Sequence, residues 1–298
     1  MQFQGSFVAI ITPFHPKGSV DWKSLEQLVE WHIGEGTDGI VCCGSTGEGV
    51  VLSDREKKRV AEVCVRTANK RIAVIVGTGT ADTRQTVRLT ESVRKLGADG
   101  SLVVTPYYNK PTQKGCILHF GEVAKVGLPV IVYHNPARAV VRLTAETIAE
   151  ISQIPGIAAI KESSHDLELM RKVQSLCSIP ILSGEDDLTF DILRAGGVGT
   201  ISVIGNVIPR GWKAMVQLCR QKKWEAAERL AKFYMPLCKA LFLETNPQCV
   251  KWAMKCLRLG NGILRLPLIE PSDKVQAALN QEFLRLSIPF FSRKAVAV

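Results

Sequence analysis

The chain has 298 residues and a formal net charge of +10, with 46% hydrophobic and 22% charged residues. This length suits a single α/β barrel, and this composition is typical of a soluble globular protein. The basic residues form only short runs without interleaved aromatic residues, so we expect no nucleic-acid partner, although a positive field can attract anionic substrates.

The cysteines and the N-terminal sequence indicate a cellular compartment. The nine cysteines are odd in number and form no CxxC motif, which argues against a disulfide or metal scaffold and predicts buried thiols in a reducing compartment. The N-terminal apolar run is short and lacks a basic segment before it, and nothing in the chain is apolar over the length of a membrane span. We therefore expect a cytoplasmic protein that does not insert into a membrane.

Short apolar runs rich in Val and Ile recur through the first two thirds of the chain. They predict strands at residues 7–11, 39–43, 72–76, 101–104, 130–133, 157–160, 179–182 and 200–204. Their continuous apolar character is typical of parallel strands that are covered on both faces. Helical periodicity lies between them, as at residues 21–35, 53–69, 144–152 and 167–176. Ser53 followed by Glu56 has the pattern of a capping box.

This alternation of strands and helices predicts a (β/α)₈ TIM barrel, with an open doubly wound sheet as the alternative. From about residue 206 only helical patterns follow, at 212–220, 224–242, 248–257 and 271–284. We assign residues 1–223 to the barrel and residues 224–298 to a C-terminal helical region packed on it.

The C-terminal ends of the strands carry the active site in such a barrel. Lys161 directly follows the apolar strand 157–160, where loss of solvation favours the neutral amine, a nucleophile for ketones. A lysine that extends its amine to solvent is the alternative. Tyr133 ends the strand 130–133 and is either a proton-transfer group or a core aromatic residue.

Polar groups follow other strands as well. Ser45 and Thr46 lie between glycines, where backbone N–H groups and two hydroxyls would hold a carboxylate, unless the segment is a plain turn. Arg138 follows a proline-fixed turn and either binds a carboxylate bidentately or lies on the surface. Tyr107 or Tyr108 is a candidate for a proton relay with Tyr133.

We expect no metal site at these strand ends. Glu162 and the pair Glu185-Asp186 have no histidine nearby and no regular third carboxylate. His134 is expected to be structural, and His15, His32, His119 and His165 show no ligand spacing.

Taken together, the strand ends resemble those of the dihydrodipicolinate synthase / N-acetylneuraminate lyase family of pyruvate-dependent barrels. The resemblance runs from about Gly5 to Pro267. It rests on the motifs GSTGE (44–48), GTGT (77–80), VTPYYNKP (104–111), YHNPAR (133–138), IKES (160–163), LSGEDD (182–187), TNPQCVKW (245–252) and LRLPL (264–268).

Within this family, several of the motifs look like the synthase branch. That likeness implies condensation of pyruvate with L-aspartate-4-semialdehyde to give 4-hydroxy-tetrahydrodipicolinate, in the diaminopimelate route to lysine. It implies Lys161 as the Schiff-base residue, Tyr133 as the acid/base, and Ser45 and Tyr108 as relay hydroxyls. Apart from the imine with pyruvate at Lys161 the reaction would use no cofactor or metal.

The resemblance also implies how substrates and subunits are arranged. Thr46 would bind the pyruvate carboxylate, Arg138 would bind the semialdehyde carboxylate, and the backbones of Gly184 and Ile201 would line the site. Tyr108 would reach into the active site of a neighbouring subunit, in a homotetramer built as a dimer of dimers.

Several positions depart from the synthase pattern. Ser45 stands where threonine is usual but keeps the hydroxyl, and His134 replaces an asparagine or aspartate. Ala137 and Ala139-Val140 replace the common G/S-R-T-G pattern, which is expected to reshape the loop that presents Arg138. The alternatives are a sister aldolase for N-acetylneuraminate or a 2-keto-3-deoxy sugar acid, and a non-catalytic ligand-binding barrel.

The positions that match the family's inhibitory lysine site depart further. They carry Gly49, Val50, Asp54, Lys57, Ala81 and Gln85, with Tyr107 kept. The cation of Lys57 would repel a bound lysine. We therefore expect weak or absent feedback inhibition by lysine.

Overall fold

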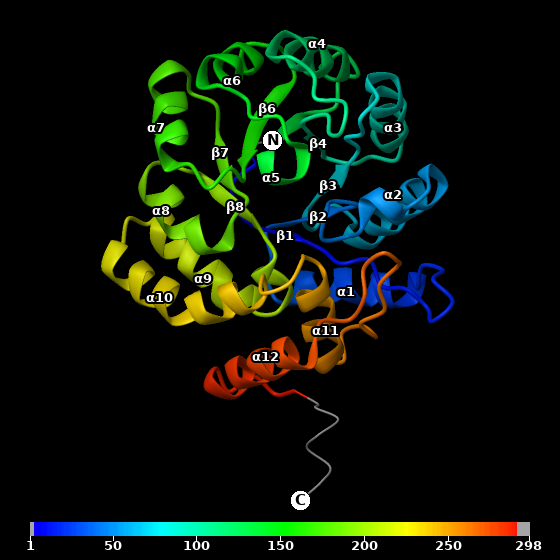
Figure 1. Cartoon of the computed structure of the whole chain (residues 1–298), viewed down its shortest axis with the longest axis vertical. Helices are drawn as coiled ribbons and strands as arrows, with labels where there is room; N and C mark the ends of the chain where they lie inside the picture. The colour runs from blue at the N-terminus through cyan, green and yellow to red at the C-terminus, as the bar shows by residue number, and fades with distance from the viewer. Residues whose placement is uncertain (1–2, 291–298) are drawn as a thin grey trace, which may run out of the picture.

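The computed structural model describes residues 3–290, in which eight parallel strands close into a barrel in sequence order (Figure 1). The strands are β1 (Gly5–Ala9), β2 (Gly39–Cys42), β3 (Ala73–Gly77), β4 (Gly100–Val104), β5 (Val130–His134), β6 (Ile157–Glu162), β7 (Ile181–Ser183) and β8 (Gly199–Ser202). Because β1 pairs with β8 from Gly5 opposite Gly199 onward, the sheet has no edge, and the open-sheet alternative is excluded.

Helices surround this barrel and continue beyond its last strand. The α-helices are α1 (Trp22–Gly34), α2 (Asp54–Ala68), α3 (Thr83–Lys95), α4 (Gln113–Ala124), α5 (Pro136–Ala139), α6 (Ala145–Ser152), α7 (Leu167–Leu176), α8 (Thr189–Arg194), α9 (Pro209–Arg220), α10 (Trp224–Ala240), α11 (Gln248–Cys256) and α12 (Asp273–Arg285). Short 3₁₀ turns lie at η1 (Gly49–Val51), η2 (Asp186–Leu188) and η3 (Ile204–Asn206).

The helix boundaries follow local chemistry. The capping box that begins α2 is confirmed: the Ser53 side chain accepts from the Glu56 N–H, and Glu56 accepts from the Ser53 N–H. Helix α9 begins at Pro209, earlier than the apolar pattern indicated, because proline lacks an N–H and has a fixed φ that suits the first turn.

The barrel interior is a packed layer of side chains rather than a pore. Phe7, Val41, Ile131, Leu182 and Ile201 are among the buried residues of this layer. A larger apolar cluster lies between the strands and the outer helices and extends into α11 and α12. The interior is therefore filled, and only the ends of the strands are available to a substrate.

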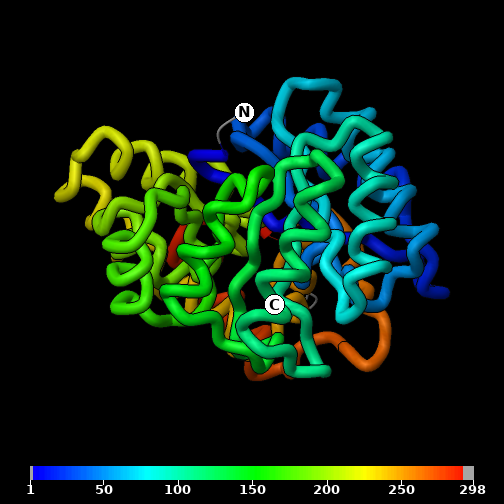
Figure 2. Tube along the Cα trace, turned by 90° about the horizontal axis from the view of Figure 1, so that it is seen from above, coloured from blue at the N-terminus to red at the C-terminus, as the bar shows by residue number. Residues whose placement is uncertain are grey.

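The C-terminal helices pack outside the ring. Helix α10 contacts α9 and α12, and α11 contacts α12. In the view of Figure 2, the orange segment that precedes α12 crosses the end of the barrel opposite the N-terminus. Since β1 begins near the N-terminus, this is the end at which the strands finish. The C-terminal region thus reaches the face that carries the candidate active site.

No helix within residues 3–290 is long and apolar enough to cross a bilayer.

Candidate active site

Lys161 and Tyr133 lie side by side because their strands pair in register. In the β5–β6 pairing, Tyr133 is opposite Lys161, and both side chains are buried, each 6% exposed. Lys161 Nζ lies 4.2 Å from the centroid of the Tyr133 ring. No residue in the described part of the chain forms a hydrogen bond or ion pair with this amine. The arrangement places an unengaged amine beside a phenol at the mouth of the barrel.

The surroundings of Tyr133 alter the acidity of its phenol. Burial alone would raise its pKa, but the positive charges of Lys161 and Arg138 and a hydrogen bond from Asn135 together bring the pKa below its usual value. Asn135 Nδ2 donates to Tyr133 Oη at 2.9 Å. A phenol with a lowered pKa transfers protons more readily near neutral pH.

The loop after β2 supplies two hydroxyls at the same mouth. Ser45 and Thr46 line the cavity that contains Lys161 and Tyr133. Thr46 is buried, and Asn246 Nδ2 donates to Thr46 Oγ1 at 3.0 Å. Asn246 comes from the loop between α10 and α11, so the C-terminal region contributes directly to the cavity wall.

The backbone at Gly184 touches the lysine stem. A Cβ added there would lie 2.6 Å from Lys161 Cε and would also collide with Ser163 Oγ. Only glycine leaves the lysine side chain room in its present position. Ile201, in contrast, is fully buried in β8 with its side chain in the interior layer.

Arg138 lies at the rim of the same cavity, on the short helix α5. Its guanidinium Nη2 donates to the Asn246 carbonyl at 3.0 Å, so one contact orients it while its other donors remain available to a ligand. One of the residues that depart from the family pattern in this loop, Val140, has an unusual backbone conformation. Val140 is the C-cap of α5 with φ of 67°, a backbone conformation that is strained for a β-branched residue.

Tyr108 is not among the residues that line the cavity at Lys161. It is 89% exposed and has φ of 69°. Tyr107, its neighbour, instead lines a cavity of about 440 Å³ that shares Ser45, Tyr133 and Arg138 with the cavity at Lys161. This volume lies in the range of small-molecule sites. A single subunit therefore brings together every predicted relay group except Tyr108.

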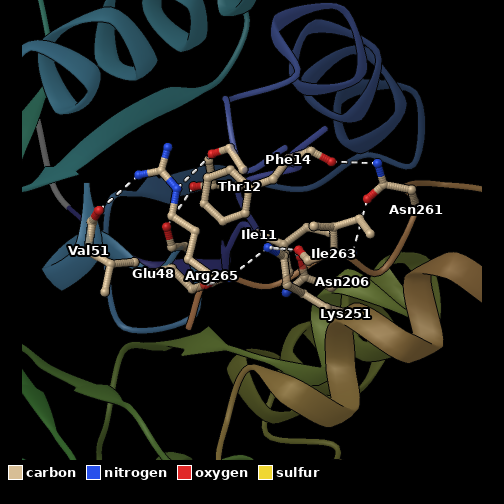
Figure 3. A network of polar contacts seen from close by, with 12 residues as sticks. Ile11, Thr12, Phe14, Glu48, Val51, Asn206, Lys251, Asn261, Ile263 and Arg265 are labelled. Carbon is tan, nitrogen blue, oxygen red and sulfur yellow. Dashed lines mark hydrogen bonds and ion pairs between the residues drawn. The ribbon is translucent and has the colours of Figure 1, made fainter. Parts of the chain in front are cut away.

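A buried polar network fixes the base of the GSTGE loop (Figure 3). Glu48 and Lys251 form an ion pair in which each side chain is 1% exposed. Lys251 Nζ also donates to the Ile263 carbonyl at 2.7 Å, and the Arg265 N–H donates to Glu48 Oε2 at 3.0 Å. Burial lowers the pKa of Lys251 to about 8 despite the nearby Glu48 carboxylate. The network ties the loop that carries Ser45 and Thr46 to the C-terminal region.

His134 has a structural role, as expected. The Leu143 N–H donates to His134 Nε2 at 3.0 Å, so Nε2 is an acceptor and Nδ1 carries the proton. That Nδ1–H donates to Glu162 Oε2 at 2.9 Å. The imidazole thus joins β6 to the far end of the loop that carries Arg138.

The expectation that no histidine lies near the strand-end carboxylates was wrong. His165 Nε2 lies 3.0 Å from Glu185 Oε2, because the loops that follow the neighbouring strands β6 and β7 meet. His165, Glu185 and Asp187 place ligand atoms within 4.8 Å of one another. Asp186 instead is buried and accepts the N–H groups of Val203 and Ile204 at 3.0 and 2.7 Å.

Asn135 and Asn246 were not identified as site residues from the sequence. Asn135 stands two residues after Tyr133, and alternate residues of an extended chain share a face, so a signal for it was present. Asn246 lies 200 residues from Thr46, and the sequence offered no signal for that contact beyond the TNPQCVKW motif itself.

Known proteins resemble the chain over nearly its whole length. The model of the dihydrodipicolinate synthetase family matches residues 2–284. A 4-hydroxy-tetrahydrodipicolinate synthase of Thermodesulfovibrio yellowstonii is 44% identical over 274 residues, which cover 91% of this chain and 94% of the relative.

Solved structures agree with this match. Chloride-inhibited dihydrodipicolinate synthase from Acinetobacter baumannii, complexed with pyruvate, superposes with a TM-score of 0.93 at 39% identity, over 96% of this chain and 99% of that one. A structure described as the first monomeric dihydrodipicolinate synthase variant gives a TM-score of 0.93 at 35% identity, over 96% and 97% of the two chains. The chain belongs to the dihydrodipicolinate synthetase family.

Proposed function

We propose that this protein condenses pyruvate, held as an imine on Lys161, with L-aspartate-4-semialdehyde to give 4-hydroxy-tetrahydrodipicolinate for diaminopimelate and lysine biosynthesis. The observation that carries the proposal is the buried Lys161 amine, 4.2 Å from the Tyr133 ring centroid and without another protein partner among residues 3–290. Relatives named for this reaction, at 44% identity, support the same conclusion.

The first half of the reaction activates pyruvate. The neutral Lys161 amine attacks the ketone carbon, and the carbinolamine loses water to form the imine. Tyr133 supplies the proton that leaves with the hydroxyl and then accepts a proton from the pyruvate methyl group, which leaves an enamine. The protonated imine nitrogen carries a positive charge. It therefore favours the phenolate form of Tyr133, as the charged lysine does before the imine forms.

The second half forms the carbon–carbon bond. The enamine carbon attacks the aldehyde carbon, and the aldehyde oxygen becomes a hydroxyl by taking back the proton that Tyr133 accepted from the methyl group. The substrate's own amine then adds to the imine carbon and displaces Lys161, which closes the ring and regenerates the enzyme. No cofactor is needed, because the lysine imine serves as the electron sink.

The two carboxylates are assigned to different walls of the cavity. Thr46, fixed by Asn246, and the glycine-flanked loop at Ser45 suit the pyruvate carboxylate. Arg138 at the rim suits the semialdehyde carboxylate, since its planar guanidinium can bind bidentately. This arginine is also what favours the synthase over a sugar-acid lyase, which needs hydroxyl-binding groups at the same rim.

We further propose that the protein acts in the cytoplasm as a homotetramer, a dimer of dimers in which Tyr108 completes the neighbouring site. A tyrosine that is 89% exposed leaves a large apolar ring in water, unless a partner covers it. Because one relative is described as a monomeric variant, sedimentation measurements on this chain are needed. A monomer with full activity would contradict the shared relay.

Trapping with borohydride tests the proposed chemistry. Incubation with pyruvate and borohydride is expected to add one reduced pyruvate adduct to the peptide that contains Lys161. The Lys161→Ala variant should give no adduct, whereas Lys172→Ala, which removes an exposed lysine, should behave as wild type. Addition of the semialdehyde should then yield the cyclic product. An adduct that persists in Lys161→Ala would refute the assignment.

A further inference from the structure

We propose that Asn135 is a positioning residue for this reaction, and that its single amide holds both the Tyr133 hydroxyl and the turn that presents Arg138. The inference rests on the roles proposed above for Tyr133 and Arg138. It adds a residue that links the proton-transfer group to the group that binds the second substrate.

The orientation of the Asn135 amide follows from its partners. Its Oδ1 accepts from the Arg138 N–H at 3.1 Å, as the N-cap of α5. A backbone N–H can only donate, so it must face the amide oxygen, and Nδ2 must then face Tyr133. Nδ2 lies 2.9 Å from Tyr133 Oη. The side chain is 6% exposed and lines the cavity at Lys161.

This geometry acts on Tyr133 in two ways. Because Nδ2 only donates, it stabilises the phenolate more than the phenol, and it directs the phenolic hydrogen away from Asn135, towards the cavity. The charged groups that act on the phenol are Lys161 from β6, Arg138 from α5 and Glu185 from the end of β7. Asn135 differs from all three because its amide is neutral at every pH.

The same amide acts on Arg138 through the backbone. Helix α5 has only four residues and is followed by its C-cap Val140, whose φ of 67° is unfavourable for a valine. A cap at the first turn offsets this strain, since the Asn135 side chain adds a second acceptor for the Arg138 N–H, which also donates to the Asn135 carbonyl at 3.1 Å. Without it, the turn that sets the position of the Arg138 side chain is less well defined.

Two substitutions separate these effects. Asn135→Ser keeps an N-cap oxygen but is too short to reach Tyr133, so kcat should fall about tenfold while KM for the semialdehyde stays within about twofold. Asn135→Ala loses both contacts and should also raise that KM about fivefold. Thr144→Ala removes the N-cap of the neighbouring α6 and controls for cap loss alone; its kcat and KM should not change.

A titration tests the Tyr133 contact without catalysis. The tyrosinate absorbance of each protein, minus that of the same protein carrying Tyr133→Phe, reports Tyr133 alone. Its midpoint should rise by about one pH unit in Asn135→Ser and Asn135→Ala and should not move in Thr144→Ala. An unchanged midpoint, or equal KM values in the two Asn135 variants, overturns the proposal. Failure of borohydride trapping in the wild type would instead refute the proposed function, while the titration would still decide the role of Asn135.

Discussion

Replacement of Lys251 by methionine should destabilise the protein strongly, although Lys251 contacts no substrate. The change leaves the Glu48 carboxylate buried with a single remaining hydrogen bond, from the Arg265 N–H, and leaves the Ile263 carbonyl without its donor. Loss of one partner of a buried ion pair costs about 3–5 kcal/mol. For a chain of this size, a loss of about 4 kcal/mol lowers the melting temperature by about 6 °C.

Equilibrium unfolding in urea, at one fixed protein concentration, measures the effect. Lys255→Met is the matched control, since Lys255 lies one turn further along α11 but pairs with Glu270 nearer the surface; its loss should stay below about 1 kcal/mol. The double variant Glu48→Gln, Lys251→Met removes both charges and should recover about 2 kcal/mol relative to Lys251→Met alone.

Two results would refute this reasoning. One is a Lys251→Met protein as stable as the Lys255→Met protein. The other is a double variant whose loss equals the sum of the losses from Glu48→Gln and Lys251→Met, since that additivity would mean that the two buried groups do not interact.

Three further predictions concern turnover, regulation and pH. Tyr108→Phe should lower kcat about tenfold or more without changing the melting temperature, and unchanged turnover would count against the shared relay. Micromolar lysine should leave the initial rate unchanged, because the cation of Lys57 repels it; inhibition at these concentrations would show that this is wrong. Burial raises the pKa of Asp186 to about 7, so the folded protein keeps a proton that the unfolded chain releases near pH 4, and stability falls as the pH rises between these values. Asp186→Asn removes this loss, so its stability relative to wild type should increase by about 3 kcal/mol from about pH 5 to about pH 8, as measured by urea unfolding; a difference that does not change with pH would contradict the raised pKa.

The fold was predictable because each strand is a compact Val- and Ile-rich run and each boundary has local chemistry, such as the capping box at Ser53. Lys161 and Tyr133 could be identified because residues at the ends of parallel strands share one face of a barrel. Their adjacency depends on the β5–β6 register, which the sequence pattern alone does not specify.

Long-range polar contacts were not predictable in this way. The partners Thr46 and Asn246, and likewise Glu48 and Lys251, lie some 200 residues apart, and no periodicity links them. The meeting of His165 with Glu185 depends on the paths of two loops, and loop geometry is set by tertiary packing rather than by local sequence. The sequence therefore predicted which strand ends bear polar groups, but not which of those groups touch.

The glycine beside the lysine stem limits how this scaffold can be redesigned. Because a Cβ at position 184 would lie 2.6 Å from Lys161 Cε, even an alanine there would displace the reactive nitrogen, and misplacement by about 1 Å can reduce the rate about a hundredfold. Mutant libraries intended to change the accepted aldehyde should leave this position untouched. They can vary Ala137, which is exposed and lines the cavity beside Arg138, and leave the imine-forming centre in place.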